Sequence, residues 1–411
     1  MTGAVTTAGR ALVPLGLVLG LVLTGCAPSA DVRDAAEVAD DGVAAVEPAP
    51  VPETVDPSGA PLLSDDGTGT GTGSGSGSGS DQEDTEVDDD DRDDDERGLT
   101  APTAFPDWMT RPTPDGSPCP AGGLRVTDAD ELRAALDDAG PGTVIQLEPG
   151  VYRGEFVTTG SGTADSPARL CGPADAVLDG GGHTGGYVLH LDGAQHWVLS
   201  GFTVRNGQKG VMADGTTGTT ISGLTVYGTG DEAIHLRRHS TDNLVTGNTI
   251  SDTGLRKEKF GEGVYVGTAV SNWGEITDGE PDRSDRNRVV GNAVYATTSE
   301  SVDVKEGTAG GVVSGNQFDG SRITGADSWV DVKGNGWTVA DNVGRHTPLD
   351  GFQTHDVADG WGTDNVFTGN AGELTVADGV LVALRPENDN RAACDNTLLT
   401  DVGGVTDKRC R

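Results

Sequence analysis

The sequence has few aromatic and few basic side chains. Aromatic residues make up 4% of its 411 residues, and 28 lysines and arginines stand against 65 aspartates and glutamates, a formal net charge of −37. The scarcity of aromatic residues beside 64 glycines disfavours a helical enzyme and favours a turn-rich β architecture. The acidic excess would repel phosphate backbones, so we expect no nucleic acid partner.

Motifs that mark several common enzyme classes are also missing. No phosphate-binding loop, nucleophile elbow, nucleotide motif or CxxC pair occurs. The histidines at 183, 196, 239 and 346 show no metal-ligand spacing. We therefore expect no cofactor other than the calcium considered below.

Long apolar runs are scarce as well. The run from Ala11 to Leu23 follows Arg10 and is too short to span a bilayer, which is typical of an export signal. It leads into Leu-Thr-Gly-Cys26, which resembles the bacterial lipobox. The resemblance implies a lipoprotein signal peptide over residues 1–25 and lipidation of Cys26, whereas the alternative is an ordinary cleaved signal with an incidental cysteine. We expect an extracytoplasmic protein that meets the cell membrane through this lipid anchor alone.

Residues 26–105 lack apolar periodicity. They include alternating Gly and Thr or Ser over 67–80 and an acidic run over 81–97. Such segments cannot bury enough apolar surface to offset the entropy of ordering, so we predict a disordered stalk anchored at Cys26. A calcium sink or partner-binding tail is the alternative for the acidic run. The folded domain is predicted over 106–411, as a monomer.

Four cysteines remain in the predicted folded domain. Export would allow disulfides, and three pairings are possible on paper. Cys119 with Cys171 and Cys394 with Cys410 close the shorter loops, so we favour that pairing.

Similar segments recur along the folded part. Turn signals such as Gly291-Asn292 and Gly315-Asn316 recur at separations of 22 to 28 residues, with one interval of 44. They alternate with strands of one buried and one exposed face, such as Val302 to Lys305. This period predicts an all-β solenoid in which each unit stacks on the next. The long interval is interpreted as one unit with two inserted loops, 255–261 and 268–286.

The start of the domain adds a resemblance. A short helix is predicted over Asp128 to Leu136, followed by PGTVIQLEPGVYRG and AVLDG. This order resembles the N-terminal cap and first turn of pectate-lyase-like right-handed parallel β-helices, over residues 119–385. The resemblance implies a right-handed parallel β-helix with a short N-terminal capping helix.

Aligning the strands on their turns predicts outward-facing columns. The middle column comprises His190, Met212, His235, Tyr265, Asp303, Asp331, Gln353 and Leu381. The column at the strand ends comprises Asp192, Asp214, Arg237, Gly267, Lys305, Lys333, His355 and Ala383. Neighbouring strands are about 4.8 Å apart, so these side chains should stack. We interpret them as a polar groove for an extended sugar chain.

The chemistry that matches an acidic polysaccharide is β-elimination. It needs a cation for the uronate carboxylate, a base for the proton on the adjacent carbon and a donor for the leaving oxygen. Lys305 is the candidate base, and Tyr265 or His235 is the candidate donor.

The other candidate site residues support these groups. Lys333, Arg237 and His355 would stabilise charge. Calcium would bind Glu262 and Glu300, or Asp303 and Asp331. The predicted substrate-binding residues are His235, Asp303, Asp331, Gln353 and Trp329.

Glu300 and Lys305 carry a second resemblance. A glutamate five residues before a lysine, next to a unit with a second cation, is similar to the chondroitinase B and alginate lyase family. That family has a second upstream acid where this chain has Thr298, and an arginine where it has Lys333.

Three other interpretations remain open. The columns would also suit a checkerboard of surface ion pairs. A glycoside hydrolase would use Asp303 and Asp331 as its carboxyl pair. A polysaccharide-binding or cell-wall protein would hold the polymer without cleaving it.

Overall fold

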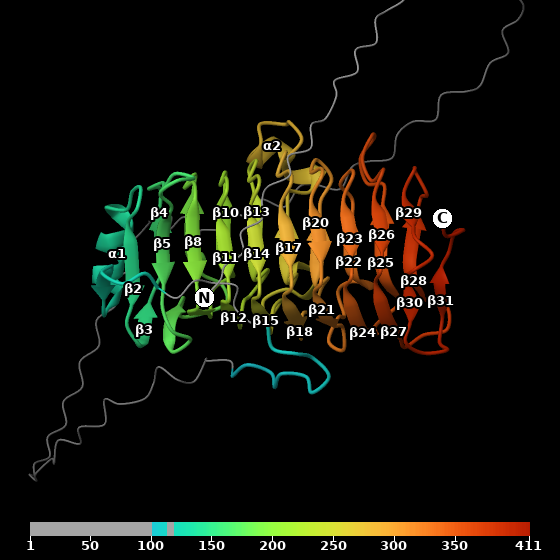
Figure 1. The fold of residues 1–411 in the computed structure, drawn as a ribbon, viewed down its shortest axis with the longest axis horizontal. Coiled ribbons are helices and arrows are strands. Elements are labelled where there is room, and N and C mark those ends of the chain that lie inside the picture. The colour runs from blue at the N-terminus through green and yellow to red at the C-terminus, as the bar shows by residue number, and fades with distance from the viewer. Residues whose placement is uncertain (1–100, 113–118) are drawn as a thin grey trace, which may run out of the picture. The chain divides into compact units, whose positions relative to one another are not determined.

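The structure, a computed structural model, describes residues 101–112 and 119–411. The predicted signal peptide, Cys26 and almost all of the predicted stalk lie outside the described residues. Within the described part, the chain winds through three parallel sheets, which Figure 1 shows as stacked arrows along one axis. The predicted solenoid is confirmed. No helix in these residues is both long and apolar enough to cross a membrane.

Each turn of the solenoid, called a coil here, contributes one strand to each sheet. Sheet A has 11 strands: β1 (Leu124–Val126), β2 (Val144–Leu147), β5 (Ala168–Cys171), β8 (Trp197–Ser200), β11 (Thr220–Ser222), β14 (Leu244–Thr246), β17 (Arg288–Val290), β20 (Val312–Ser314), β23 (Thr338–Ala340), β26 (Val366–Thr368) and β29 (Arg391–Ala392).

Sheet B has 10 strands: β3 (Gly150–Arg153), β6 (Ala176–Asp179), β9 (Thr203–Arg205), β12 (Thr225–Tyr227), β15 (Thr249–Ser251), β18 (Ala293–Tyr295), β21 (Gln317–Asp319), β24 (Val343–Thr347), β27 (Ala371–Leu374) and β30 (Thr397–Leu398).

Sheet C also has 10 strands: β4 (Phe156–Thr158), β7 (Tyr187–Asp192), β10 (Lys209–Asp214), β13 (Ile234–Arg237), β16 (Val264–Val266), β19 (Val302–Val304), β22 (Ser328–Val332), β25 (Asp350–His355), β28 (Val380–Arg385) and β31 (Gly404–Thr406).

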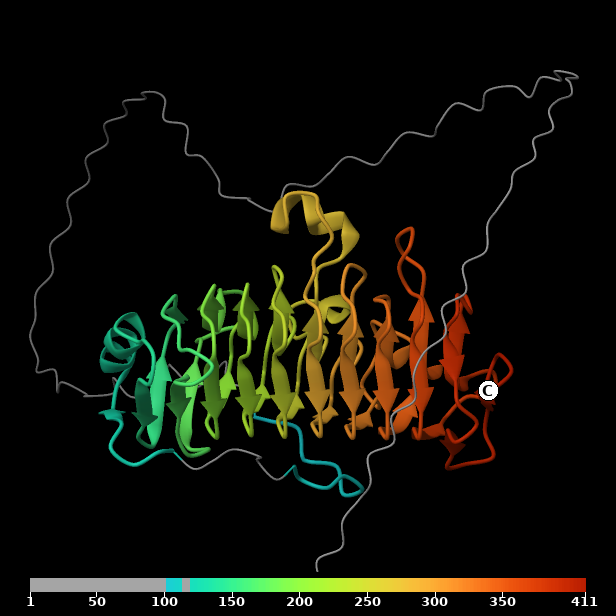
Figure 2. The same ribbon diagram turned by 45° about the horizontal axis from the view of Figure 1, so that its top comes forward.

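A short helix covers the first coil, as predicted. Helix α1 (Ala129–Asp137) begins after Asp128, whose carboxylate accepts hydrogen bonds from the backbone N–H groups of Asp130 and Glu131. Such N-caps satisfy donors that the helix itself leaves unpaired. Leu132 and Leu136 are buried against the first strands, and Figure 2 shows α1 at one end of the solenoid. The helix therefore closes the apolar interior at this end.

The interior is a continuous column of aliphatic side chains. Val302 and Val304 of β19 stack on Val330 and Val332 of β22, and all four are completely buried. Parallel strands covered on one side by the other sheets bury every second residue in this way. The predicted core column is confirmed.

The glycine and the asparagine of each recurring Gly-Asn pair have different structural roles. Gly291 and Gly315 have φ angles of 67° and 63°, which glycine adopts without strain. The asparagines instead point inward: the backbone N–H and Nδ2 of Asn292 both donate to Oδ1 of Asn316, at 2.9 and 3.0 Å. The sequence interpretation assigned both residues to turn conformation. The asparagine is in fact a rung of a buried hydrogen-bonded ladder.

One predicted register is wrong. The predicted columns place Leu381 beside Gln353 and Ala383 beside His355, but Ala383 pairs with Gln353 and Arg385 with His355. A shift of two residues preserves the alternation along the strand, so alternation alone cannot detect it. Alternation fails at Leu381, which is completely buried although it stands directly before the inward-facing Val382. Ala383, not Leu381, therefore continues the middle column, and Leu381 packs in the core.

Both predicted disulfides are present. Cys119 is bonded to Cys171 and Cys394 to Cys410, with Cα–Cα distances of 5.6 and 5.0 Å. The first bond joins the segment before β1 to the end of β5, and the second closes the C-terminal coil. Each therefore lies near one end of the solenoid, where a coil has a neighbour on one side only.

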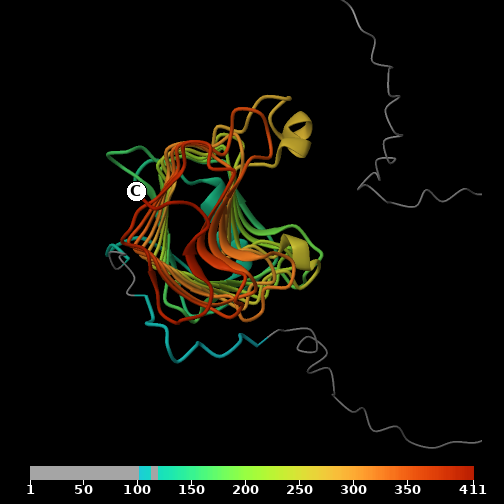
Figure 3. The same ribbon diagram turned by 90° about the vertical axis from the view of Figure 1, so that its right-hand side faces the viewer.

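The long interval is one coil with two insertions, as predicted, because β17 pairs directly with β14. The first insertion lies between β15 and β16 and contains the 3-10 helix η1 (Glu258–Phe260). The second lies between β16 and β17 and contains η2 (Val270–Asn272) and α2 (Trp273–Ile276). Viewed along the axis, both insertions project on the same side of the solenoid (Figure 3). They flank the two ends of β16 in sheet C.

Candidate active site on sheet C

Two lysines and two aspartates form an ion-pair ladder on the outer face of sheet C. Asp303 of β19 lies directly beside Asp331 of β22. The ammonium groups of Lys305 and Lys333 lie 2.6 and 2.7 Å from the two oxygens of Asp303, and Lys333 also lies 2.7 Å from Asp331. Nδ1 of His355 lies 2.9 Å from Asp331 and ends the ladder. These five residues are the predicted stack.

The ladder is buried, unlike an ordinary set of surface ion pairs. Asp303 is 1% exposed and Asp331 3% exposed, and the side chain of Lys333 is 11% exposed. Exposed ion pairs are screened by water, whereas buried pairs hold their partners in fixed geometry. The checkerboard of solvated surface charges is therefore not what the structure contains.

Both lysines are held in the charged form. Burial alone lowers the pKa of the Lys305 ammonium, but the charge and hydrogen bond of Asp303 outweigh it and raise the pKa well above its usual value. For Lys333, burial is likewise outweighed by the charges of Asp303 and Asp331. For Lys333, the two aspartates also outweigh the opposing charge of Lys305.

Asp331 is held ionised. Burial would raise its pKa, but the charge of Lys333 and the hydrogen bond with His355 lower it to about 2. The same hydrogen bond raises the pKa of His355 above its ordinary value, although burial opposes this shift. His355 is the most exposed member of the ladder, with 35% of its side chain accessible.

Tyr265 of β16 lies beside the ladder. The Lys305 ammonium is 5.0 Å from the centre of the Tyr265 ring, and the His235 ring packs edge-on against it at 4.4 Å. Burial and the charge of Asp303 raise the pKa of Tyr265 well above its usual value. Its phenol is therefore protonated at neutral pH, as a proton donor requires.

His235 of β13 is held neutral. Burial and the charges of Lys209 and Arg237 lower its pKa well below the ordinary value. Nε2 lies 2.9 Å from the carbonyl oxygen of Gly267, and the buried Nδ1 has no hydrogen-bond partner among the described residues. On β25, at the other end of the ladder, Gln353 donates to Asp327 at 2.6 Å, and its Oε1 has no partner in the described part. Such unpaired buried atoms call for an explanation, and a bound ligand is one.

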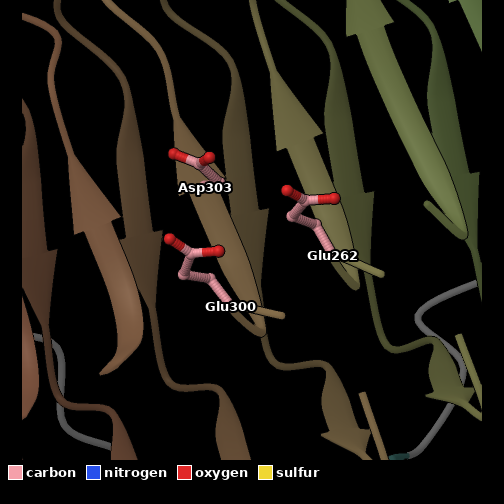
Figure 4. Close-up of side chains that lie close together, drawn as sticks. All are labelled: Glu262, Glu300 and Asp303. Atoms are coloured by element: carbon pink, nitrogen blue, oxygen red, sulfur yellow. The ribbon is translucent and has the colours of Figure 1, made fainter. Parts of the chain in front are cut away.

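Three carboxylates converge at the start of β16 and β19. One oxygen from each of Glu262, Glu300 and Asp303 lies within 4.8 Å of the others, and Figure 4 shows the three side chains pointing toward one another. Burial and the charges of Glu232 and Asp303 raise the pKa of Glu262 well above its usual value. Burial and the charge of Asp303 raise that of Glu300 to about 7.

Part of this cluster suits a hard cation. Oε2 of Glu262 is buried and has no partner among the described residues, while Glu300 accepts a hydrogen bond from Ser299. Carboxylate oxygens at this separation fit calcium. Both oxygens of Asp303 already contact lysine ammonium groups, so Glu262 and Glu300 are the residues free to bind a cation.

Arg237 does not join the ladder. It lies on β13, two strands from β19, and its guanidinium bonds to Asp214 at 2.7 Å and to the hydroxyl of Tyr187 at 3.2 Å. Asp214 also lies 3.0 Å from His190. A pocket of about 250 Å³ opens beside this second group, between Asp214 and the segment that follows α2. The predicted cations are thus divided between two places on sheet C.

Trp329 is a wrong prediction. It is completely buried in the core, packs against Phe352 at 5.6 Å, and donates its indole N–H to the carbonyl oxygen of Arg345. A ligand on the surface cannot reach it. Trp329 lies inside β22, between Ser328 and Val330, and it is buried together with Val330, so the alternation of the strand fails at this position.

Further polar side chains, which the sequence prediction left without a role, lie in or beside these groups. Lys209 of β10 forms an ion pair with Glu232, whose other oxygen lies 3.5 Å from Nδ1 of His235. His190 and Asp214 stood in the predicted columns without a role. Their position in the same columns as Tyr265 and Lys305 was the signal that would have included them.

Comparisons with known proteins agree with this fold. Residues 184–343 match the family model described as a right handed beta helix region. No curated protein matches the chain significantly. Among solved structures, the pectate lyase Pel9A has a TM-score of 0.51 at 14% identity. The match covers 67% of this chain and 72% of the Pel9A chain, and it is a likeness of fold.

A second solved structure is more similar in sequence. The alginate lyase of Paenibacillus sp. str. FPU-7 is 32% identical, with a TM-score of 0.67. The likeness covers 70% of this chain and 99% of the alginate lyase. The chain therefore belongs to the pectate-lyase-like family of right-handed parallel β-helix proteins.

Proposed function

We propose that the protein is a polysaccharide lyase that cleaves a uronate-containing polysaccharide by β-elimination. The observation that carries the proposal is the placement of Tyr265 against Lys305, within a row of buried cations on the outer face of sheet C. The likeness to an alginate lyase over nearly all of that enzyme supports the choice of an acidic substrate.

In the proposed reaction, a base removes the proton on the carbon beside the uronate carboxylate. The electron pair of that bond forms a carbon–carbon double bond, the glycosidic carbon–oxygen bond breaks, and the departing oxygen takes a proton. Lys333 stabilises the charge that develops on the carboxylate, Lys305 is the base, and Tyr265 donates the proton to the leaving oxygen.

Lys305 must lose a proton before it can act as a base. Asp303 stabilises its ammonium form, and Lys333 offsets part of the Asp303 charge by bonding its other oxygen. A calcium ion held by Glu262 and Glu300 would supply further positive charge, favouring neutral Lys305 and neutralising the uronate carboxylate.

The ladder disfavours a glycoside hydrolase that uses Asp303 and Asp331 as its carboxyl pair. A hydrolase needs one carboxyl group that is protonated near neutral pH. Asp331, with its pKa lowered to about 2, is ionised, and both oxygens of Asp303 contact ammonium groups. A non-catalytic binding protein remains the second candidate, because a row of fixed charges would also hold an acidic polymer.

The proposal is tested by incubating the full chain with alginate, pectate and glycosaminoglycans, with and without calcium. We expect one of these polymers to give a product that absorbs in the ultraviolet, as the conjugated double bond of an unsaturated uronate does. New reducing ends without unsaturation would indicate a hydrolase. Retention of polymer without any new ends would indicate a binding protein.

Two substitutions then test the base. Lys305→Ala should lower kcat by about 100-fold or more, as expected for loss of a general base. Lys305→Arg keeps the positive charge but has no neutral form at working pH. It should be as inactive as Lys305→Ala if Lys305 is the base. Substantial activity of Lys305→Arg would assign Lys305 to charge stabilisation instead.

We also propose that the protein acts outside the cytoplasm, anchored by lipidated Cys26. Support comes from the two disulfides, because such bonds persist in oxidising compartments. Cell fractionation of the parent and of Cys26→Ser tests this. The parent should be recovered with membranes and the variant in the soluble extracytoplasmic fraction.

A further inference from the structure

A segment before the first strand lies along the outer face of sheet B. Residues 103–110, called the strap here, run beside coils that come more than 140 residues later in the chain. Figure 1 shows the segment below the lower edges of the strands. Its contacts are specific hydrogen bonds and ring contacts, described next.

The strap is fixed at both ends and in the middle. At one end, both the backbone N–H and the hydroxyl of Thr103 donate to the carboxylate of Asp252. In the middle, the Trp108 indole N–H donates to Asp319 at 2.7 Å. At the other end, the backbone N–H and carbonyl of Thr110 bond to the side-chain amide of Gln317, at 2.7 and 2.8 Å.

Apolar and cation–π contacts also join the strap to sheet B. The Phe105 ring packs edge-on against Tyr295 at 5.5 Å, and the Arg345 guanidinium lies 5.0 Å from the Trp108 ring. Met109 is buried in a small apolar cluster with Tyr295. Asp252, Asp319 and Tyr295 are each 4% exposed. The strap therefore covers part of sheet B as a packed element.

Three of these contact residues, Tyr295, Asp319 and Arg345, fall on one column of sheet B; Asp252 directly follows Ser251 of that column, and Gln317 lies two residues earlier on β21. Ser251, Tyr295, Asp319 and Arg345 are neighbours on β15, β18, β21 and β24 in the strand register. After this column, each coil turns toward sheet C. The strap thus holds the starting points of four successive turns.

The four turns lead to the candidate active site. The turn after Ser251 carries Glu262 and enters β16, and the turn after Tyr295 carries Glu300 and enters β19. The next two enter β22 and β25, which carry the rest of the ladder. Asp252, which Thr103 binds, is the first residue of the first insertion. The strap crosses the same coils that supply Tyr265, Asp303, Asp331 and His355.

We propose that the strap is a positioning segment for the proposed active site. By fixing the column from Ser251 to Arg345, it holds the turns that place Glu262 and Glu300 beside Asp303. Displacements of about 1 Å in catalytic groups cost up to about 100-fold in rate. The catalytic readout of this inference rests on the proposed function, but its structural readout does not.

The test uses the full chain with Phe105→Ala and Trp108→Ala combined, and with Trp108→Phe alone. Trp108→Phe keeps a ring but loses the N–H donor to Asp319. Val151→Ala is the control: Val151 lies on β3 of sheet B, is 48% exposed, and belongs to a coil that these strap contacts do not reach. Circular dichroism checks that each variant is folded.

Hydrogen exchange is measured for the turns 252–263 and 296–301. We expect the double variant to exchange about tenfold faster there, with unchanged exchange in β8 and β11, and a smaller change for Trp108→Phe. The control should leave these turns unchanged. Equal exchange in parent and double variant would overturn the proposal, and so would a uniform increase through the whole solenoid.

Kinetics completes the test. If the parent is a lyase, kcat of the double variant should fall about tenfold while KM changes little, since the segment does not touch the substrate-facing side of sheet C. Faster exchange in the turns with unchanged kcat would overturn the positioning role. If the parent has no lyase activity, the proposed function fails, and the exchange result alone decides whether the strap holds the turns.

Discussion

At the scale of single residues, Asp303 is the centre of the site. Its two oxygens contact the ammonium groups of Lys305 and Lys333, and it lies against Glu262 and Glu300 on its other side. Removing such a carboxylate would leave two buried cations unpaired, which costs about 3–5 kcal/mol of stability. Asp303 is therefore unsuitable for testing catalysis, because its loss would also unfold the site.

Tyr265 allows a cleaner test. Tyr265→Phe removes the hydroxyl and keeps the ring that packs against His235, so the fold should be unchanged. We expect kcat to fall by about 100-fold, as for loss of a general acid, with little change in KM. Steady-state kinetics on the responding polymer measures this. Tyr227→Phe, on sheet B, is the control, and a Tyr265→Phe variant as fast as that control would contradict the role.

His355 predicts a pH dependence of stability. Its hydrogen bond to Asp331 raises its pKa above the unfolded value of about 6.5, although burial opposes the shift. The charged groups that face it are Asp331, Lys333 and Asp327. A raised histidine pKa contributes stability that is fully present below the unfolded pKa and is lost as the pH rises through the folded pKa.

We therefore expect Tm to fall as the pH rises above about 6.5. The fall should be smaller in His355→Asn. Thermal unfolding of both proteins between pH 5 and 9 measures the difference. Parallel Tm curves for parent and variant would show that His355 makes no such contribution.

At the scale of structural elements, the asparagine ladder ties successive coils together. Each buried side-chain amide donates both to the neighbouring asparagine and to a backbone carbonyl, as Asn316 does to Asn342 and Val289 at 2.9 Å each. Without the amide, buried backbone donors and acceptors of the turn would be unpaired. The solenoid repeats this turn in successive coils, so the same loss would recur along the stack.

Asn316→Ala should destabilise the fold. It leaves the Asn292 donors without their acceptor in a buried turn, at a cost of about 1–3 kcal/mol. Urea unfolding measures this. Asn272→Ala is the matched control, since Asn272 is exposed and its side chain makes no capping hydrogen bond to α2. Equal midpoints for the two variants would show that the ladder contributes little.

At the scale of the whole molecule, the net charge of −37 opposes an acidic substrate. The lysines of sheet C attract a uronate only at short range, because they are paired with aspartates. The Debye length falls from about 30 Å at 0.01 M salt to about 8 Å at 0.15 M. Added salt should therefore screen the long-range repulsion between the protein and the polymer before it screens the short-range attraction by the lysines.

We expect KM for the acidic polymer to fall when salt is raised from 0.01 to 0.15 M. Sucrose at the same osmolarity should leave KM unchanged. A rise of KM with salt would mean that local attraction by the lysines outweighs the charge of the whole molecule.

Several features followed from the sequence alone. The spacing of Gly-Asn pairs and the alternation in segments such as Val302 to Lys305 determine the coils, since each coil must bury one face against the next. The neighbours Asp303 and Asp331 and the two insertions followed from the same alignment, and the two disulfides from the preference for shorter loops. Local patterns suffice here because a solenoid places equivalent residues of successive coils side by side.

Only the tertiary structure decided the rest. The charged state of Lys305 depends on which carboxylate its flexible side chain reaches, and spacing does not contain that information. Trp329 and Leu381 are buried directly before an inward-facing valine, which breaks the alternation that the sequence predicts, whereas the two-residue register shift before Val382 leaves that alternation unchanged. Neither feature can be read from the alternation. The strap joins Thr103 to Asp252 and Trp108 to Asp319, and no repeat links these distant residues. Such contacts exist only once the coils have stacked, because stacking creates the column on sheet B against which the strap packs.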